Sequence, residues 1–354
     1  MAVRLTTPVS IVTGFLGSGK TTLINRILRE KHDQRIAIIE NEYGAVGVDA
    51  EFLVTERAET VIQLANGCLC CTVRGDLARA LHAFVIQAEK GGFAFDRVLI
   101  ETTGIADPGP IIQTFLAETT LLNHFHLDGV ITLIDGVHGE SQFSRVENQA
   151  QIGYADRVLL SKSDLISAAQ REVLRERIAA MNARADLLPV DIHSAGLGEL
   201  IGLLFDTQSY RFDYVARDEL QRYANCAPSS NASLSIGPPA SRRPRHTADV
   251  VSCVFESETA LDRSRLNDFF DALQLRYGNR LWRYKGIVHV SNERPRLVIQ
   301  GVQSLLQINA GTVWRPFEKR RTVLIFIGQK LESDWINGQL RLCETQQDAV
   351  ASRS

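Results

Sequence analysis

The chain has 354 residues, 45% hydrophobic and 23% charged, which is enough for two domains that each bury a core. A formal net charge of -2 and a pI near 6.5 exclude a general attraction to nucleic acid or anionic membranes, so we expect neither as a partner. Because no run of about 18 uncharged apolar residues occurs and the N-terminus does not read as a signal peptide, we expect a cytoplasmic protein.

Through the first 205 residues, short apolar runs alternate with stretches in which apolar residues have helical spacing. Helices are expected at Lys20–Lys31, Arg74–Lys90 and Ala168–Asn182. The alternation predicts an α/β domain over 1–206, with a mostly parallel sheet covered by helices. The apolar runs that supply its strands lie at 9–13, 35–40, 96–101, 129–134, 156–160 and 187–191.

The composition changes between residues 207 and 247, where periodicity ends and Pro, Ser and Asn accumulate, as in a flexible linker. A smaller α+β domain is expected over 248–330, with a helix at Asp262–Arg276. Its strands are expected at Asp249–Glu256, Leu281–Val290, Arg296–Val302 and Thr322–Gly328. Residues 331–354 are expected to form a frayed tail.

A phosphate-binding motif follows the first apolar run. Residues 14–21 match the pattern G-x-x-x-x-G-K-[ST] between an expected strand and an expected helix, as in P-loop nucleoside triphosphatases. Lys20 would bridge the β and γ phosphates, and the Thr21 hydroxyl would ligate Mg²⁺. The residues expected to surround the nucleotide phosphates are Gly14, Gly17, Ser18, Gly19, Lys20, Thr21 and Thr22.

A second phosphate-facing segment is expected at 98–104, where an apolar strand ends in Glu101 and is followed by Gly104. The Gly104 N–H would approach the γ phosphate, and Glu101 would hold Mg²⁺ through water or polarise the attacking water. No glutamine stands where it would clearly orient this water. The general base stays open, with Glu40, Glu42 and Asp49 as further candidates.

The segment Ser161–Asp164 directly follows an expected buried strand and is similar to the N-K-x-D guanine motif of GTPases. Asp164 would accept hydrogen bonds from N1–H and the exocyclic amine of guanine, while the Lys162 stem would lie against the purine. Ser161 replaces the usual Asn, and its shorter donor is expected to reduce guanine affinity by about 1 kcal/mol. Residues 193–196 are similar to a further base-contacting loop, and the alternative for Ser161–Asp164 is an ordinary helix cap.

Three of the six cysteines, Cys68, Cys70 and Cys71, lie within four positions. Thiolates at this density favour Zn²⁺, Cu⁺ or a similar ion, and with Glu40 or Glu42 they would leave an exchangeable coordination position. Buried cysteines without function and a redox switch are the alternative interpretations.

Taken together, these motifs resemble the CobW-like P-loop GTPases. The resemblance implies a slow GTPase that binds GTP and GDP, holds zinc for an unknown metalloprotein client, and forms a homodimer or a metal-dependent oligomer. It also implies metal binding by Glu40, Cys70 and Cys71 with Cys68 close by, and places Asp49 in the first switch. The motifs that carry it are Gly14–Thr22, Glu40–Gly44, Gly67–Cys71, Glu101–Gly104, Ala106–Pro110, Ser161–Asp164 and Arg283–Gly286.

Two alternatives to metal delivery remain. One is a zinc buffer or sensor in which nucleotide turnover is incidental. The other is a GTPase that inserts cobalt or nickel into cobalamin or a metalloenzyme, because sulfur ligands do not choose uniquely among Zn²⁺, Co²⁺ and Ni²⁺.

Overall fold

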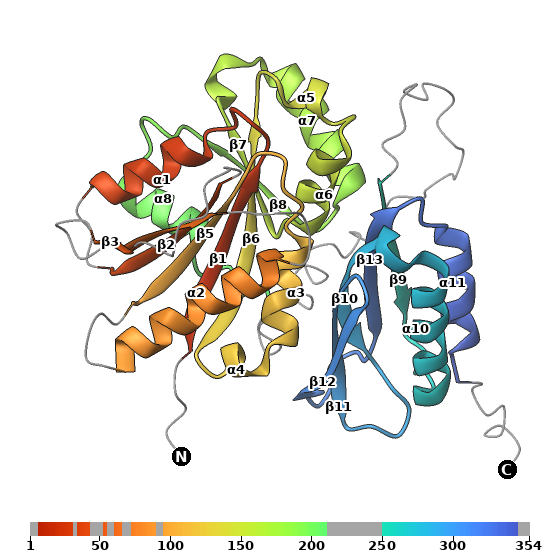
Figure 1. The fold of residues 1–354 in the computed structure, drawn as a ribbon. Coiled ribbons are helices and arrows are strands. Elements are labelled where there is room, and N and C mark those ends of the chain that lie inside the picture. The colour runs from red at the N-terminus through yellow and green to blue at the C-terminus, as the bar shows by residue number, and fades with distance from the viewer. Residues whose placement is uncertain are drawn as a thin grey trace, which may run out of the picture. The chain divides into compact units, whose positions relative to one another are not determined.

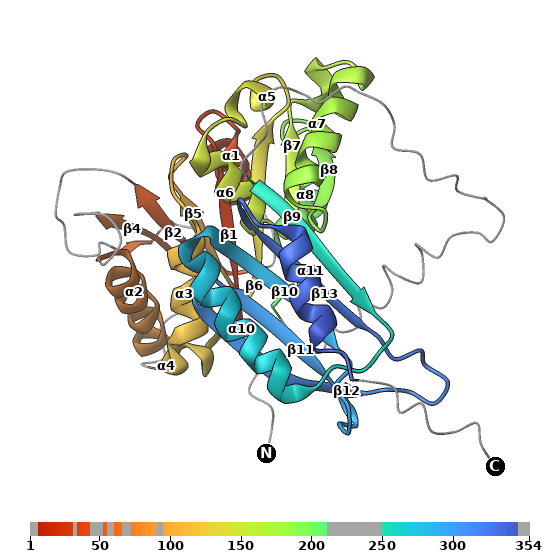
Figure 2. The ribbon, with the colours of Figure 1, turned by 90° about the vertical axis from the view of Figure 1, so that its right-hand side faces the viewer.

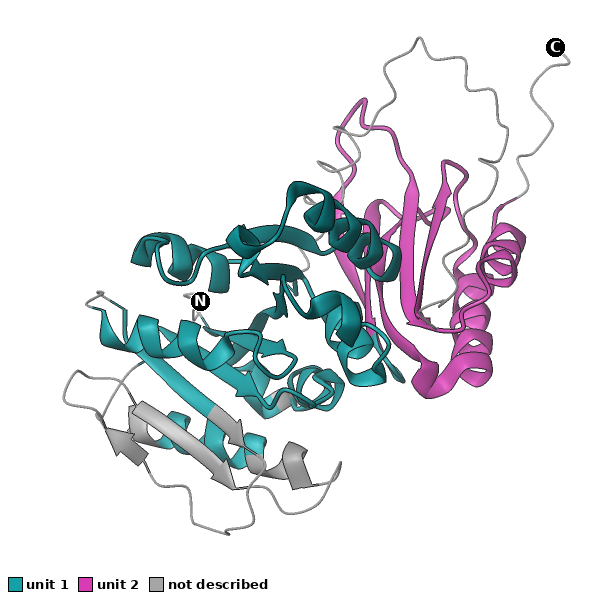
Figure 3. Ribbon diagram, turned by 90° about the horizontal axis from the view of Figure 1, so that it is seen from above, with its two compact units in different colours: residues 1–211, 302–305 teal, residues 212–301, 306–354 magenta. Residues whose placement is uncertain are grey.

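The computed structural model describes residues 6–30, 34–42, 52–54, 60–65, 72–89, 95–210 and 250–345. The chain divides into two compact units, coloured separately in Figure 3. Unit 1 comprises Met1–Arg211 with Val302–Leu305, and unit 2 comprises Phe212–Gly301 with Leu306–Ser354.

Unit 1 is built on an eight-stranded sheet with the order β3-β4-β2-β5-β1-β6-β7-β8 (Figure 1). Strand β3 is antiparallel to β4, whereas all the other neighbouring strands in this order are parallel to each other. The central strands are apolar on both faces because helices cover both. The strands are β1 (Thr7–Gly14), β2 (Ile36–Glu42), β3 (Phe52–Val54), β4 (Thr60–Ala65), β5 (Arg97–Thr102), β6 (Phe125–Asp135), β7 (Arg157–Ser161) and β8 (Asp186–Val190).

Helices lie on both faces of this sheet (Figures 1 and 2). Helices α1 and α8 share a hydrophobic core with the sheet, whereas α7 packs on the opposite face through Leu174, close to Ile134. Among the helices that the structure describes, none is both long and apolar enough to cross a membrane. The helices of unit 1 are α1 (Lys20–Arg29), α2 (Thr72–Glu89), α3 (Gly109–Ala117), α4 (Thr119–Leu122), α5 (Gly139–Gln142), α6 (Val146–Tyr154), the 3-10 helix η1 (Ser163–Leu165), α7 (Ala168–Met181) and α8 (Leu197–Leu204).

Unit 2 is a five-stranded sheet with the order β12-β11-β10-β13-β9, and helices α10 and α11 pack on one face (Figure 2). Its elements are β9 (Val250–Ser257), α10 (Arg263–Tyr277), the 3-10 helix η2 (Gly278–Arg280), β10 (Leu281–Val288), β11 (Pro295–Val302), β12 (Leu305–Val313), β13 (Thr322–Gln329) and α11 (Ser333–Leu342). The fold class predicted from the sequence, a mostly parallel α/β nucleotide-binding domain with a smaller α+β domain, is confirmed.

Two predicted boundaries are wrong. The tail expected over 331–354 contains helix α11, because Ile336 and Leu340 lie one turn apart and both are fully buried in the core of unit 2. Thr207, expected to be the first linker residue, is instead held by β6, because its backbone N–H donates to Asp128 Oδ2 at 3.1 Å. The rest of the expected linker, from residue 211, lies outside the described residues.

Candidate nucleotide-binding site

The phosphate loop connects β1 to α1 and depends on glycine at three positions. Gly14, Gly17 and Gly19 have φ angles of 141°, 78° and 99°, which residues with a side chain rarely adopt. A Cβ on Gly14 would lie 2.3 Å from the Leu133 carbonyl oxygen. Gly19 precedes α1 and has no side chain to cap it, so the first N–H groups of this helix are available for an anion.

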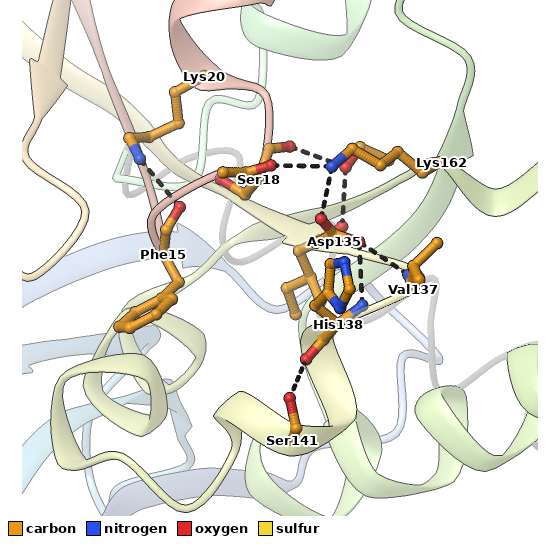
Figure 4. A network of polar contacts seen from close by, with 11 residues as sticks. Phe15, Ser18, Lys20, Asp135, Val137, His138, Ser141 and Lys162 are labelled. Atoms are coloured by element: carbon orange, nitrogen blue, oxygen red, sulfur yellow. Dashed lines mark hydrogen bonds and ion pairs between the residues drawn. The ribbon is translucent and has the colours of Figure 1, made fainter. Parts of the chain in front are cut away.

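Lys20, the first residue of α1, folds back over this loop. Its Nζ donates to the carbonyl oxygens of Gly14 at 2.6 Å and Phe15 at 3.2 Å, the second of which Figure 4 shows. Burial lowers the pKa of Lys20 below its ordinary value, while the neighbouring Glu101 carboxylate raises it. The ammonium group therefore lies at the phosphate loop, and its contact with the β and γ phosphates stays a prediction.

The two residues expected around Mg²⁺ come together from different elements. Thr21 Oγ1 on α1 donates to Glu101 Oε1 near the end of β5 at 3.0 Å. The adjacent strands are joined at the same level by Thr102 Oγ1, which donates to Thr13 Oγ1 at 2.8 Å. A hydroxyl and a carboxylate at this spacing provide the oxygen ligands that Mg²⁺ prefers, directly or through water.

Gly104 lies directly against the phosphate loop. A Cβ there would come within 2.7 Å of the Leu16 backbone nitrogen, so only glycine allows this approach. The segment is held from α6, where the buried Gln151 Nε2 donates to the carbonyl oxygens of Gly104 at 3.2 Å and Ala106 at 3.1 Å. Gln151 belongs to none of the sequence motifs and lies 47 residues further along the chain than Gly104.

The base loop after β7 also contacts the phosphate loop (Figure 4). Ser161 Oγ, which is buried, donates to the Ser18 carbonyl oxygen at 2.8 Å. Lys162 adopts a left-handed backbone, and its Nζ donates to the Gly17 carbonyl oxygen at 3.1 Å. Asp164 lies in the 3-10 helix η1 and is exposed. The candidate phosphate and base residues are therefore neighbours in space, although more than 140 residues separate them in the chain.

Asp135, at the end of β6, is a residue of this site that the sequence analysis missed. Its Oδ2 accepts a hydrogen bond from Lys162 Nζ at 2.6 Å, and its Oδ1 accepts from the Val137 and His138 N–H groups at 2.8 and 3.0 Å. Burial raises the pKa of Asp135, but hydrogen bonds from Lys162, His138 and Val137 outweigh it and hold the pKa below its ordinary value. An acid directly after an apolar strand is the signal that could have identified it, as it did for Glu101.

The loop after β8, expected to approach the base, packs against the start of α1. Arg26 Nη1 donates to the Ile192 carbonyl oxygen, and a Cβ on Gly19 would lie 2.8 Å from Ile192 Cδ1. Asp191 shapes the following turn by accepting from the His193 N–H at 2.9 Å. The loop therefore lies beside the phosphate loop, and its contact with a base stays a prediction.

The candidate metal ligands are described only in part. Glu40 and Glu42 lie at the end of β2, where Glu40 pairs with Glu101 of β5 in the backbone register; their side chains are outside the described residues. Asp49, Cys68, Cys70 and Cys71 also lie outside them. Within the described ranges, no group of three His, Cys, Asp or Glu side chains is arranged to hold a metal ion.

Two family models together cover most of the chain. Residues 8–189 match the model for the CobW/HypB/UreG nucleotide-binding domain, and residues 250–344 match the cobalamin synthesis protein cobW C-terminal domain. The chain belongs to the CobW/HypB/UreG family of GTPases. The resemblance indicated by the sequence motifs is confirmed.

Relatives of this CobW-type chain include the zinc chaperone YjiA of Escherichia coli, 38% identical over 330 residues, which are 93% of this chain and 96% of YjiA. The zinc-regulated GTPase metalloprotein activator 1 of Schizosaccharomyces pombe is 39% identical over 193 residues, 51% of this chain and 45% of that protein. The crystal structure of Zn(II)-bound YjiA GTPase from E. coli matches with a TM-score of 0.74 at 34% identity, covering 96% of this chain and 100% of the other.

Proposed function

We propose that this protein hydrolyses GTP to GDP and phosphate, and that its nucleotide state controls the binding of a transition metal, first of all zinc, for delivery to a client protein. The observation that carries the nucleotide part is the direct contact between the base loop and the phosphate loop. Ser161 Oγ and Lys162 Nζ donate to the consecutive carbonyl oxygens of Ser18 and Gly17 at 2.8 and 3.1 Å. One connected frame would thus hold the base and the phosphates of the same nucleotide.

The phosphate end of this frame fits a triphosphate. The glycine loop and the start of α1 would surround the β phosphate, and the Lys20 ammonium would move from two carbonyl oxygens to the β and γ phosphates, offsetting charge there. Thr21 and Glu101 would hold Mg²⁺, which supplies charge neutralisation at the phosphates when bound. Glu101 would also polarise the attacking water, while a general-base role for Asp49 stays a prediction.

The base end of the frame favours guanine. Asp164 would accept both N–H groups on the guanine edge, whereas adenine offers an acceptor at N1 and would leave the carboxylate without a partner. The Lys162 stem would pack on the purine face. Since Ser161 already donates within the protein, the base contacts fall to Lys162 and Asp164.

The sheet topology supports coupling to a metal. Strands β4, β2, β5 and β1 are parallel neighbours, so their carboxyl ends share one edge of the sheet with the phosphate loop. Strand β4 ends at Ala65, three residues before Cys68, and β2 ends at Glu42. We therefore keep Cys68, Cys70 and Cys71 with Glu40 or Glu42 as the proposed ligands of the delivered ion.

Zinc is the first choice of metal because YjiA is a zinc chaperone and is structurally known with Zn(II) bound. The Schizosaccharomyces pombe relative is a metalloprotein activator, which supports a protein client. The proposal also keeps the expected cytoplasmic location, where thiols are reduced. Homodimer formation or metal-dependent oligomerisation stays part of it, as the resemblance implies.

The test of GTPase activity is the substitution Lys20→Ala. Loss of the ammonium group at the phosphates is expected to lower Mg²⁺-dependent GTP turnover by about 100-fold to 1,000-fold. Turnover is measured as phosphate release from purified full-length protein. The control is Lys319→Ala, which removes an exposed lysine of unit 2 that pairs with Glu258 and is expected to leave turnover unchanged. Equal rates for Lys20→Ala and the unmodified protein would show that turnover does not use this site.

A further inference from the structure

Two acceptors hold the ammonium group of Lys162 (Figure 4). Its Nζ donates to the Gly17 carbonyl oxygen at 3.1 Å and to Asp135 Oδ2 at 2.6 Å. The side chain of Lys162 is 42% exposed and that of Asp135 only 2%. A buried carboxylate therefore anchors the polar end of a lysine whose side chain is still partly exposed.

Asp135 is itself fixed in place. Its Oδ1 accepts two backbone N–H groups of the turn after β6, which leaves Oδ2 directed at Lys162. This turn is joined to the base loop, because the Gly136 N–H donates to the Ser161 carbonyl oxygen at 2.8 Å. A Cβ on Gly136 would lie 2.9 Å from that same oxygen, so the two loops are packed closely. The carboxylate is thus placed by the sheet and its turn.

Ser161 cannot take over this anchoring. Its single hydroxyl hydrogen is shared between the carbonyl oxygens of Ser18 at 2.8 Å and Ile134 at 3.2 Å. The side chain is buried against the phosphate loop. A GTPase with Asn at this position has an additional side-chain amide that can hold the base loop. Because Ser161 has no such amide, the placement of the base loop in this protein depends more strongly on Lys162.

We propose that Asp135 is a positioning residue for nucleotide binding, which fixes Lys162 so that its stem forms one wall of the purine site. This inference rests on the proposed GTP binding and deepens it. Asp135 acts on nucleoside affinity, because Lys162 packs against the purine face. It does not act on the choice of the guanine edge, which belongs to Asp164, or on the rate of phosphate release, which belongs to Lys20.

The test uses Asp135→Asn in the full chain. Asparagine keeps an oxygen for the two turn N–H groups and removes the charge facing Lys162. Its KM for GTP is expected to rise about tenfold with kcat unchanged, as for the loss of a charge-assisted hydrogen bond. The preference for GTP over ITP, which lacks the 2-amino group, is expected to stay the same because Asp164 is intact.

Two comparisons separate positioning from a general structural role. In a Lys162→Met background, which keeps the stem and removes the ammonium group, Asp135→Asn is expected to raise KM no further. Asp128→Asn is the matched control: Asp128 is a buried acid on the same strand that accepts backbone N–H groups of Thr207 and Gln208, far along β6 from the base loop. It is expected to leave KM unchanged.

The failure of this inference is distinct from the failure of the proposed function. If the unmodified protein hydrolyses GTP but Asp135→Asn leaves KM unchanged, or changes kcat and the GTP-to-ITP ratio as well, Asp135 is not a positioning residue. Absence of GTP binding by the unmodified protein would remove both proposals. If Asp135→Asn does not fold, Asp135→Ser replaces it, because its hydroxyl can still accept a hydrogen bond from the turn N–H groups. The same KM measurements, with and without Lys162→Met, are then expected to give the same result.

Discussion

Gly14 and Gly17 lie three positions apart in the phosphate loop and differ in their surroundings. Both have a positive φ, 141° and 78°, so either substitution strains the backbone. A Cβ on Gly14 would also overlap the Leu133 carbonyl oxygen at 2.3 Å, whereas a Cβ on Gly17 meets nothing within 4 Å. The requirement for glycine at position 14 therefore comes from packing as well as from the backbone angle.

We expect Gly14→Ala to lower the free energy of unfolding by about 1–3 kcal/mol more than Gly17→Ala, because only the first forces atoms apart in a packed interior. Urea denaturation without nucleotide measures this difference without a contribution from ligand binding. Equal losses for the two variants would mean that the loop relaxes away from β6.

Motif spacing identifies the residues of the site that act through local sequence. Lys20, Thr21 and Lys162 lie at or beside the phosphate loop, where the motifs predict them, because a strand, a turn and a helix fix their neighbours; their contacts with a nucleotide stay a prediction. Asp135 and Gln151 are not found, because their roles arise only when β6 and α6 pack beside loops that are 27 and 47 residues away. Asp135 still carries a readable signal, an acid after an apolar strand; Gln151 in the middle of α6 carries none.

The sequence predicts the strands of unit 1 whose described residues are buried on both faces, since each contains a mostly apolar run; these are β1, β2, β5, β6 and β7. The prediction misses β3, which has only three residues, and β4, in which Gln63 interrupts the apolar run. It also misses α11, because Asn337 and Gly338 in its centre are poor helix formers. Tertiary packing of Ile336 and Leu340 against the sheet forms this helix in spite of its local propensity.

Helix α11 provides a matched pair of leucines with which to test this explanation. Leu340 is fully buried in the core of unit 2, whereas Leu342, two residues later, is 65% exposed. We expect Leu340→Ala to destabilise unit 2 by about 2–5 kcal/mol and Leu342→Ala to stay within about 0.5 kcal/mol of the unmodified protein. Thermal unfolding followed by tryptophan fluorescence reports this, because Trp335 packs against the same core. Similar small effects of both variants would show that α11 is not part of the core.

The parallel sheet of unit 1 extends from the phosphate loop after β1 to β4, the strand that precedes the proposed cysteine ligands in the chain. Three strand spacings, from β4 through β2 and β5 to β1, place the end of β4 about 14 Å from the phosphate loop. This distance exceeds the Debye length of about 8–10 Å at physiological salt, so an added charge on the nucleotide would act on a divalent ion at low ionic strength, where screening is weak. At low ionic strength, the proposed coupling would therefore need no contact between the two ligands.

The nucleotide state is expected to change zinc affinity. A GTP analogue carries one more negative charge than GDP, which would favour nearby Zn²⁺ by about 1 kcal/mol, or roughly fivefold in Kd. Competition with a zinc-chelating dye, in the presence of analogue, GDP or no nucleotide, measures this difference. Thermodynamic reciprocity requires that zinc tighten binding of the analogue relative to GDP by the same factor.

Two cysteine variants localise this effect to the proposed ligands. Replacing both Cys70 and Cys71 by Ser is expected to abolish the high-affinity zinc site and its dependence on nucleotide. Cys253→Ala, which removes a buried thiol of unit 2, is expected to change neither. A zinc buffer would show the same affinity in all three nucleotide states, and tighter competition by Co²⁺ or Ni²⁺ at matched free concentrations would assign the cargo to those ions instead.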